Sequence, residues 1–103
     1  MSTYKLTYFN WRARAEVSRL LFAVSGQEYE DYRIQDRAEW TRSIKSTMPL
    51  GQLPVLTING KTVIPQSKAI ERYLARELGL YGKSNMENTM CDVFIETCQS
   101  DFR

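Results

Sequence analysis

The sequence contains no histidine, and this absence excludes several kinds of active site at once. Ser-His-Asp and Cys-His nucleophile systems, metal sites with two histidines and imidazole acid–base chemistry all need that residue. Any catalysis by this chain must therefore use tyrosine, lysine, arginine, carboxylates or a bound reagent.

Cysteine is nearly as scarce, because only Cys91 and Cys98 occur in 103 residues. On one helix, a separation of seven residues places the two Cα atoms about 10.5 Å apart. A disulfide needs Cα atoms closer than about 7 Å, so we predict that both cysteines stay reduced in the core.

Long apolar segments are also missing. The longest run is Leu20-Leu21-Phe22-Ala23-Val24, far below the roughly 18 residues of a membrane span. The amino terminus, Met1-Ser2-Thr3-Tyr4-Lys5, lacks the charged-then-apolar layout of a secretory signal. With 43% hydrophobic and 25% charged residues, the composition is typical of a globular protein. We expect a soluble, cytoplasmic protein with no membrane partner.

The net charge is only +2, but the two parts of the chain carry opposite excesses. Residues 1–84 contain 13 lysines and arginines against 8 acidic residues, whereas residues 85–103 contain 1 against 4. The sign changes just after Gly79-Leu80-Tyr81-Gly82, which we interpret as a connector. Because the basic residues are scattered singly, we expect no nucleic-acid binding and favour a small anionic ligand in the first part.

Hydrophobic periodicity divides the first part of the chain into alternating strands and helices. An aromatic-rich alternation predicts a strand at 4–9, and a 3.6-residue period predicts a helix from about residue 12 that ends at Gly26. An acidic strand at 29–34 suggests a sheet edge, and a short helix is expected at 38–46. The predicted buried stripe of the first helix is Val17, Leu20, Leu21 and Val24.

The next segment predicts a β-hairpin followed by a helix. Asn59-Gly60 lies between two apolar runs, 55–58 and 61–64, and this dipeptide is the strongest short hairpin signal. Pro65 is expected to stop the second strand, and Ser67 to cap a helix that runs to about Leu78. The order β-α-β-α-β-β-α predicts a layered α/β domain.

The last segment, 85–103, is predicted to be one helix with two apolar stripes. One stripe can pack on the α/β domain, and the other needs a partner: either further helices or another subunit. The first stripe is Met86, Met90, Val93, Phe94 and Thr97, and the second is Cys91, Ile95, Cys98 and Phe102.

Three features are predicted to meet where strands end and helices begin. Tyr8 ends the first strand, with Arg12 and Arg14 at the start of the following helix. Leu53-Pro54 precedes a strand, and Gln66-Ser67 begins a helix. Such positions collect ligands in α/β folds, anions above all.

Five stretches occur together in the order typical of one known family: YKLTYFN at 4–10, Arg12, RAE at 14–16, IKSTMP at 44–49 and QSxAIxRYL at 66–74. Together they resemble the sigma-class glutathione S-transferases, which include the glutathione-dependent prostaglandin D synthases. The resemblance covers essentially all 103 residues. It implies a thioredoxin-like glutathione-binding domain at 1–79, a linker at 80–84, and at 85–103 the first helix of a truncated all-helical domain.

The resemblance also implies a role for each matching residue. Tyr8 and Arg14 would be catalytic, because the Tyr8 hydroxyl donates a hydrogen bond to the glutathione sulfur and Arg14 favours the same anion. A free thiol has a pKa of about 8.5, and a hydrogen bond to a charged acceptor, worth about 1.5–3 kcal/mol, lowers that pKa by roughly one to two units. The implied glutathione contacts are Phe9 beside Tyr8, Leu53 and the cis-proline Pro54 at the cysteinyl part, Gln66 and Ser67 at the γ-glutamyl carboxylate, and Trp40, Lys45 and Gln52 at the glycyl end.

The partners implied by the resemblance are glutathione as co-substrate and a small electrophilic or lipid-derived second substrate, as in detoxification. Full-length members form homodimers and complete each other's sites with an acid on the first helix of the helical domain. Here that position falls on Gln99 or Ser100, with Asp101 displaced, and only Glu96 keeps its place. We therefore expect no metal. Two departures from the family pattern are an extra residue between Trp40 and Lys45, and Pro65 before Gln66.

Two functions remain open from the sequence. The first is glutathione transfer or isomerisation, with the glutathione site kept and most of the second-substrate pocket missing. The second is a non-catalytic structural or interaction protein, like the lens crystallins of this class, in which the stripe that contains Cys91 and Ile95 supplies the contact. A thiol–disulfide oxidoreductase is excluded, because Asn10-Trp11-Arg12-Ala13 contains no cysteine.

Overall fold

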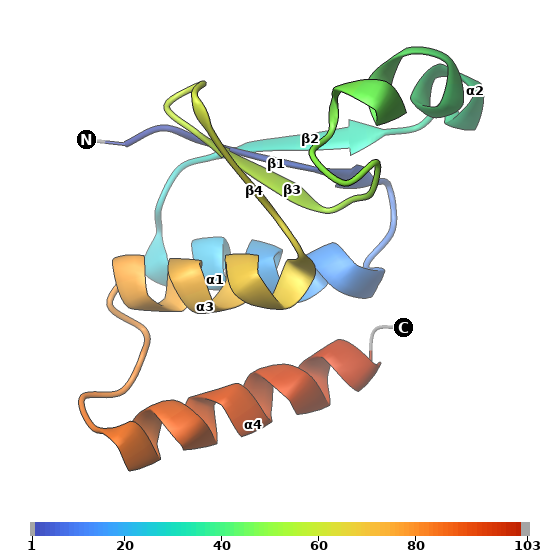
Figure 1. Ribbon diagram of the computed structural model, residues 1–103. Coiled ribbons are helices and arrows are strands. Elements are labelled where there is room, and N and C mark those ends of the chain that lie inside the picture. Colours follow the sequence, from blue (N-terminus) through green and yellow to red (C-terminus); the bar gives the residue numbers. More distant parts are fainter. Residues whose placement is uncertain (1, 102–103) are drawn as a thin grey trace.

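A computed structural model describes residues 2–101, with side chains up to Thr97. Its centre is a four-stranded mixed sheet in the order β2-β1-β3-β4 (Figure 1). In that sheet β1 runs parallel to β2 and antiparallel to β3, and β3 and β4 form a hairpin. The strands are β1 Tyr4–Phe9, β2 Glu30–Ile34, β3 Val55–Ile58 and β4 Thr62–Pro65. The predicted thioredoxin-like α/β fold, with β2 at an edge, is confirmed.

Helices cover both sides of this sheet. In Figure 1, α1 and α3 lie next to one another against one face, the segment that contains α2 lies on the other side, and α4 lies beyond α1 and α3. The helical segments are a 3₁₀ turn at Ala13–Ala15, α1 Glu16–Ser25, α2 Arg37–Glu39, a π-helical turn at Trp40–Ile44, a 3₁₀ turn at Lys45–Thr47, α3 Ser67–Glu77 and α4 Asn85–Asp101. No helix among these described residues is long and apolar enough to cross a bilayer.

The core lies between the sheet and the helices α1 and α3. Leu6 and Leu56 from the sheet, and Ile70 and Leu74 from α3, are fully buried there. Phe22 of α1 completes this layer, and its ring stacks on Tyr29 at a centroid distance of 4.0 Å. Burial of one such side chain stabilises the fold by about 1.5–3 kcal/mol, so this layer fixes the helices on the sheet.

The hairpin differs from the prediction in its boundaries. Ile58 pairs with Thr62, so the loop has three residues rather than the two-residue Asn59-Gly60. Asn59 and Gly60 take positive φ angles of 55° and 67°, a conformation that favours these residue types. Pro65 does not stop the strand but ends it in register with Val55. On an edge strand such as β4, the missing N–H of proline is tolerated.

The predicted helix at 38–46 is interrupted by a π-helical turn. The N–H of Lys45 donates to the carbonyl of Trp40, five residues earlier. A π turn accommodates one residue more than an α turn. The extra residue between Trp40 and Lys45 is therefore accommodated locally, without loss of helical backbone.

The buried stripe predicted for α1 is only partly correct. Val17 is buried, but Leu20 is 44% and Val24 is 74% exposed, whereas Phe22 and Ser18 are fully buried. The stripe faces away from the sheet, toward α4. It forms one wall of an apolar groove of about 540 Å³, which is lined by Val17, Leu20, Leu21, Val24, Ala75, Leu80, Met90, Cys91, Phe94 and Ile95.

The exposed stripe of α4 is the one that contains the methionines, although Met90 and Phe94 also border the groove. Ile95 is buried and Cys91 is half-buried, whereas Met86, Met90, Val93 and Phe94 are exposed. The expectation that the Cys91–Ile95 stripe supplies an outward contact is therefore wrong, because that stripe already faces the groove. Cys91 is a free thiol. The side chains of Cys98 and Phe102 lie outside the described residues.

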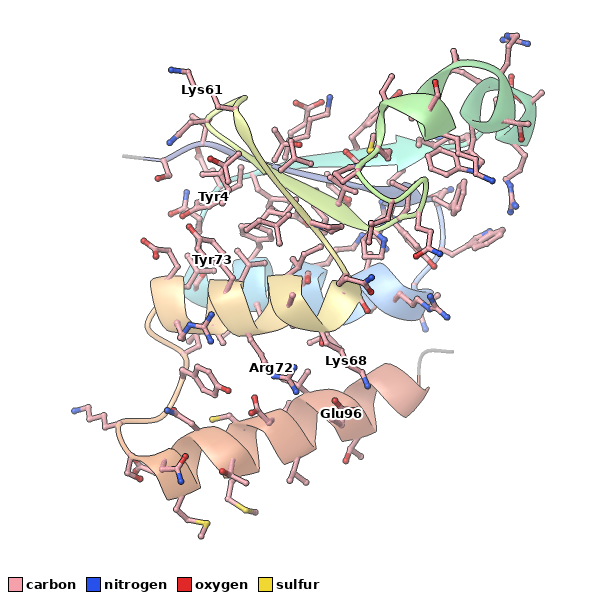
Figure 2. The ribbon with its side chains drawn as sticks, in the orientation of Figure 1. Tyr4, Lys61, Lys68, Arg72, Tyr73 and Glu96 are labelled. Carbon is pink, nitrogen blue, oxygen red and sulfur yellow. The ribbon has the colours of Figure 1, made fainter. Side chains whose placement is uncertain are left out.

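Ionic contacts join α3 to α4. Figure 2 shows Lys68 and Arg72 of α3 directed toward Glu96 of α4. Lys68 Nζ lies 2.6 Å from Glu96 Oε2, and Arg72 Nε lies 3.2 Å from Asp92 Oδ1. The hydroxyl of Tyr81 also donates to Asp92. This α3–α4 ionic cluster fixes the position of α4 under the domain.

Candidate functional site

One small cleft brings together residues that are far apart in the sequence. Its walls come from the turn before α1, the loop before β3, the end of β4 and the first turn of α3. The residues that line it are Arg14, Leu50, Gln52, Leu53, Pro54, Pro65, Gln66 and Ser67. The cleft thus contains Arg14, Gln52, the Leu53–Pro54 pair and the Gln66–Ser67 pair, which the sequence placed in one site. Leu50 and Pro65 were not predicted there.

The loop before β3 has a fixed conformation. The Leu53–Pro54 peptide bond is cis, and both side chains are buried. The loop turns at Gly51, whose φ is 61°, and the Lys45 side chain runs along it. A Cβ on Gly51 would lie 3.5 Å from Lys45 Cε. Lys45 therefore supports the loop next to Gln52, although it does not line the cleft.

The start of α3 forms the opposite wall. Gln66 has φ 77° and ψ 115°, and it occupies the N-cap position without a side-chain capping bond. Ser67 is the first helical residue, so its expected role as N-cap is wrong. The first N–H groups of a helix have no intrahelical acceptor, and they attract anions. A backbone conformation such as that of Gln66 costs about 1–3 kcal/mol and is typical of functional sites.

Arg14 gives this cleft its charge. It is the one charged residue among the described residues that line the cleft, and its side chain is exposed. A guanidinium opposite a helix N-terminus suits a ligand with a carboxylate. Elsewhere, the described residues include no group of three or more histidine, cysteine or acidic side chains that could hold a metal ion.

Tyr8, Phe9 and Trp40 do not line the cleft but form an aromatic group within and against the core. Tyr8 is the last residue but one of β1 and is 6% exposed. Its ring centroid lies 5.6 Å from that of Phe9. Trp40 is buried and meets Phe9 edge to face at 5.6 Å. The structure therefore divides the predicted site into a polar cleft and this aromatic group. The positions named for the partner subunit, Gln99, Ser100 and Asp101, have side chains outside the described residues.

Arg19 is a positioning residue that the sequence reasoning missed. It is 6% exposed, and its guanidinium donates to the carbonyls of Phe9, at 3.2 Å, and Trp11. Its Cζ lies 5.8 Å from the centroid of the Tyr8 ring. Arg19 thereby holds the backbone on both sides of Asn10, directly after Tyr8. The available signal was an arginine in the middle of a helix whose residues are mostly apolar.

Three comparisons with known proteins agree with this architecture. Residues 4–76 match the family described as glutathione S-transferase, N-terminal domain. S-crystallin SL11 of Nototodarus sloanii is 51% identical over 100 residues, which cover 93% of this chain and 48% of that protein. Hematopoietic prostaglandin D synthase of Gallus gallus is 50% identical over 97 residues, which cover 94% and 47%. A solved Nu-class glutathione S-transferase from Haemonchus contortus has a TM-score of 0.84 at 47% identity, covering 97% and 48%.

The chain spans about half the length of the relatives it matches. The matches to an S-crystallin and to a prostaglandin D synthase confirm the resemblance carried by the motifs at 4–10, 44–49 and 66–74. Because the matched domain covers most of the described fold, the relationship does not depend on one short motif. The chain belongs to the glutathione S-transferase family.

Proposed function

We propose that this chain is the glutathione-binding part of a sigma-class-like glutathione transferase. The observation that carries the proposal is the convergence of Arg14, the cis Leu53–Pro54 turn and Gln66–Ser67 in one cleft at the start of α3. A cation, free helix N–H groups and the backbone of a loop are the donors and acceptors that an anionic tripeptide needs. The relatives' names support glutathione as that ligand.

Each part of the cleft has one role in this proposal. Gln66 and Ser67, with the first N–H groups of α3, hold the γ-glutamyl carboxylate. The Leu53 backbone pairs with the cysteinyl residue as an added strand does. Gln52 and Lys45 hold the glycyl end, and Trp40 supports them from the neighbouring core.

Tyr8 performs the chemical step in this proposal. Its hydroxyl donates a hydrogen bond to the glutathione sulfur, with Phe9 beside it. This bond favours the thiolate, which is the nucleophilic form of the thiol. Arg14 and the start of the α1 segment favour the same negative charge. The thiolate then attacks an electrophile or promotes an isomerisation, and this second substrate is a small electrophilic or lipid-derived molecule.

The domain organisation belongs to the same proposal. Residues 1–79 form the glutathione-binding domain, 80–84 the linker, and 85–103 the first helix of an all-helical domain. In the whole protein, further helices complete the second-substrate pocket and two copies form a homodimer. We place this protein in the cytoplasm, where glutathione is abundant.

Calorimetric titration with reduced glutathione at pH 7 tests the ligand, and thiolate absorbance of the bound ligand tests Tyr8. We expect saturable binding, with the pKa of the bound thiol about one to two units higher in Tyr8→Phe. Tyr32→Phe is the matched control, because Tyr32 lies on β2 and contacts Lys5 instead. Folded protein that does not bind glutathione refutes the ligand. An unchanged thiol pKa in Tyr8→Phe refutes the role of Tyr8.

A non-catalytic structural role is the second candidate, and the exposed stripe of α4 favours it. Met86, Met90, Val93 and Phe94 present a row of apolar side chains to solvent, and such rows are typical of contact surfaces. If the chain associates without binding glutathione, and Phe94→Ser abolishes that association, this function replaces the first. A monomeric chain that binds glutathione excludes it.

A further inference from the structure

A second cleft, separate from the polar one, is bordered by Phe9. It has a volume of about 200 Å³ and is lined by Phe9, Asn10, Trp11, Ile34, Gln35 and Arg37. These residues follow or end β1 and β2, which run parallel. Ligands of α/β proteins bind beyond the carboxyl ends of parallel strands, so this cleft lies at a position suited to binding.

One side of this second cleft is aromatic and carries a stacked cation. The rings of Phe9 and Trp11 lie 5.3 Å apart, and Trp11 is 53% exposed. The Arg37 Cζ lies 4.5 Å from the Phe9 centroid and 5.3 Å from that of Trp11. A guanidinium that stacks through its face keeps its N–H edge available to an acceptor.

The charge of Arg37 is not paired within the part of the chain that the structure describes, and two acids of the same segment, Asp31 and Asp36, have other partners. Arg37 forms no ion pair with any residue that the structure describes. Asp31 is held by Arg19 at 3.2 Å and by Arg33 at 2.9 Å. Asp36 accepts a hydrogen bond from the Ala38 N–H at 2.9 Å. The second cleft therefore combines a flat apolar wall with an available positive charge.

The remaining wall supplies neutral donors. Arg33 donates to Asn10 Oδ1 at 2.9 Å, which fixes that amide and leaves its NH₂ group as a donor. Gln35, an exposed amide residue, lines the same cleft. A ligand with an aromatic ring and an oxygen-rich anionic group matches this set of partners.

We propose that the second cleft binds a flat aromatic carboxylate, with its ring against Trp11 and Phe9 and its carboxylate on the edge of Arg37. This inference rests on the proposed function in one respect: the ligand is the second substrate, or an aromatic part of it, because the Phe9 ring that lines the second cleft lies 5.6 Å from the ring of Tyr8. Trp11 and Arg37 then determine specificity for the substrate, while glutathione occupies the polar cleft.

Titration of the chain with naphthalene-2-carboxylate, followed by tryptophan fluorescence and calorimetry, tests the inference. We expect saturable binding, and at least about tenfold weaker binding of the neutral naphthalene-2-carboxamide. Arg37→Gln is expected to weaken carboxylate binding by a similar factor and to leave carboxamide binding nearly unchanged. Trp11→Ala should weaken both. Arg42→Gln, which changes an exposed arginine outside the second cleft, is the matched control and should change neither.

Equal affinity of the unaltered chain for the acid and the amide overturns the inference, whether or not the variants fold. So does an unchanged affinity in folded Arg37→Gln, or ligand-induced amide shifts confined to the α1–α4 groove near Val24 and Phe94. A separate titration with glutathione distinguishes the two proposals. Naphthoate binding without glutathione binding refutes the proposed function and leaves the second cleft as a site. Displacement of naphthoate by glutathione refutes the second-substrate assignment.

Discussion

The guanidinium of Arg19 donates a hydrogen bond of 3.2 Å to the carbonyl of Phe9. This bond connects the middle of α1 to the end of β1, directly after Tyr8. The same side chain reaches the Trp11 carbonyl and lies 3.2 Å from Asp31 on β2. One buried cation thus holds three segments around the position proposed to activate the thiol.

Arg19→Met is expected to destabilise the domain by about 3 kcal/mol, because it leaves the carbonyls of Phe9 and Trp11 without their donor and removes the buried partner of Asp31 and Glu16. Arg33→Met is the matched control. Arg33 also pairs with Asp31, but its side chain is 40% exposed, so the expected loss is below about 1 kcal/mol. Urea unfolding of both variants measures this difference. Equal losses would show that burial of Arg19 does not strengthen its contacts.

We expect the backbone conformation of Gln66 to lower the stability of the domain, and its side chain to strengthen glutathione binding. With φ at 77°, its backbone is strained, so Gln66→Gly should be about 1 kcal/mol more stable than Gln66→Ala. Both variants lack the side chain, and both should bind glutathione more weakly than the unaltered chain. Thermal unfolding compares the stabilities, and calorimetry compares the affinities. If glycine and alanine give the same stability, the backbone at this position carries no strain.

Acid is expected to weaken the docking of α4. The hydrogen bond from Tyr81, followed by the one from Arg72, lowers the pKa of Asp92. The unfolded chain therefore binds this proton more tightly than the folded one. The contribution of Asp92 is complete above its unfolded pKa of about 3.9 and is lost as pH falls through its lower folded pKa. Unfolding midpoints measured below pH 5 should show this loss.

Asp92→Asn should remove this acid dependence, whereas Glu77→Gln, on the exposed end of α3, should retain it. At alkaline pH the dependence has the opposite sign, because stability falls as pH rises. The hydrogen bond to Asp92 raises the pKa of Tyr81, so its contribution is complete below about pH 10 and is lost above it. A Tyr81→Phe variant should lose the alkaline dependence. Identical acid profiles for Asp92→Asn and the unaltered chain would contradict the assignment.

Ile95→Ala should detach α4 from the domain more readily than any change on its outer face. Ile95 is 4% exposed against the groove, and removal of a buried isoleucine side chain costs about 2–4 kcal/mol. Val93→Ala, on the exposed stripe, should change stability by less than about 0.5 kcal/mol. The rate of limited proteolysis in the 80–84 segment reports the detachment. Equal cleavage rates in the two variants would refute the packing described for α4.

Elements with a strong local signal were predicted well. The aromatic alternation of 4–9, the helix end at Gly26 and the hairpin at 55–65 each depend on short-range backbone preferences. Boundaries were less accurate: the hairpin loop has three residues, and Gln66 rather than Ser67 is the N-cap. A boundary that moves by one residue changes little in the local sequence pattern, and contacts with neighbouring elements decide it, as the pairing of Ile58 with Thr62 does for the hairpin loop.

The resemblance predicted the individual residues of the site. It did not predict that the site is divided into a polar cleft and an aromatic group. Arg14, Leu53 and Gln66 meet in the cleft, whereas Tyr8 and Trp40 lie in the aromatic group. Arg19 was missed because its partners are backbone carbonyls, which leave no trace in a sequence. The contact of Arg37 with Phe9 and Trp11 was missed for a similar reason. Arg37 follows β2, whereas Phe9 and Trp11 end and follow β1, and the sequence does not show that these segments meet.

The sequence by itself determined the order of strands and helices, the hairpin and the family, because these depend on local periodicity and on short motifs. Tertiary structure alone decided which apolar face became core. Leu20 and Val24 on α1, and the α4 stripe of Met86, Met90, Val93 and Phe94, have the pattern of buried faces, yet these side chains are exposed. The physical reason is that hydrophobicity specifies a face to be covered but not its neighbour. That neighbour follows from strand order β2-β1-β3-β4, which also brings residues 14, 53 and 66 into one cleft.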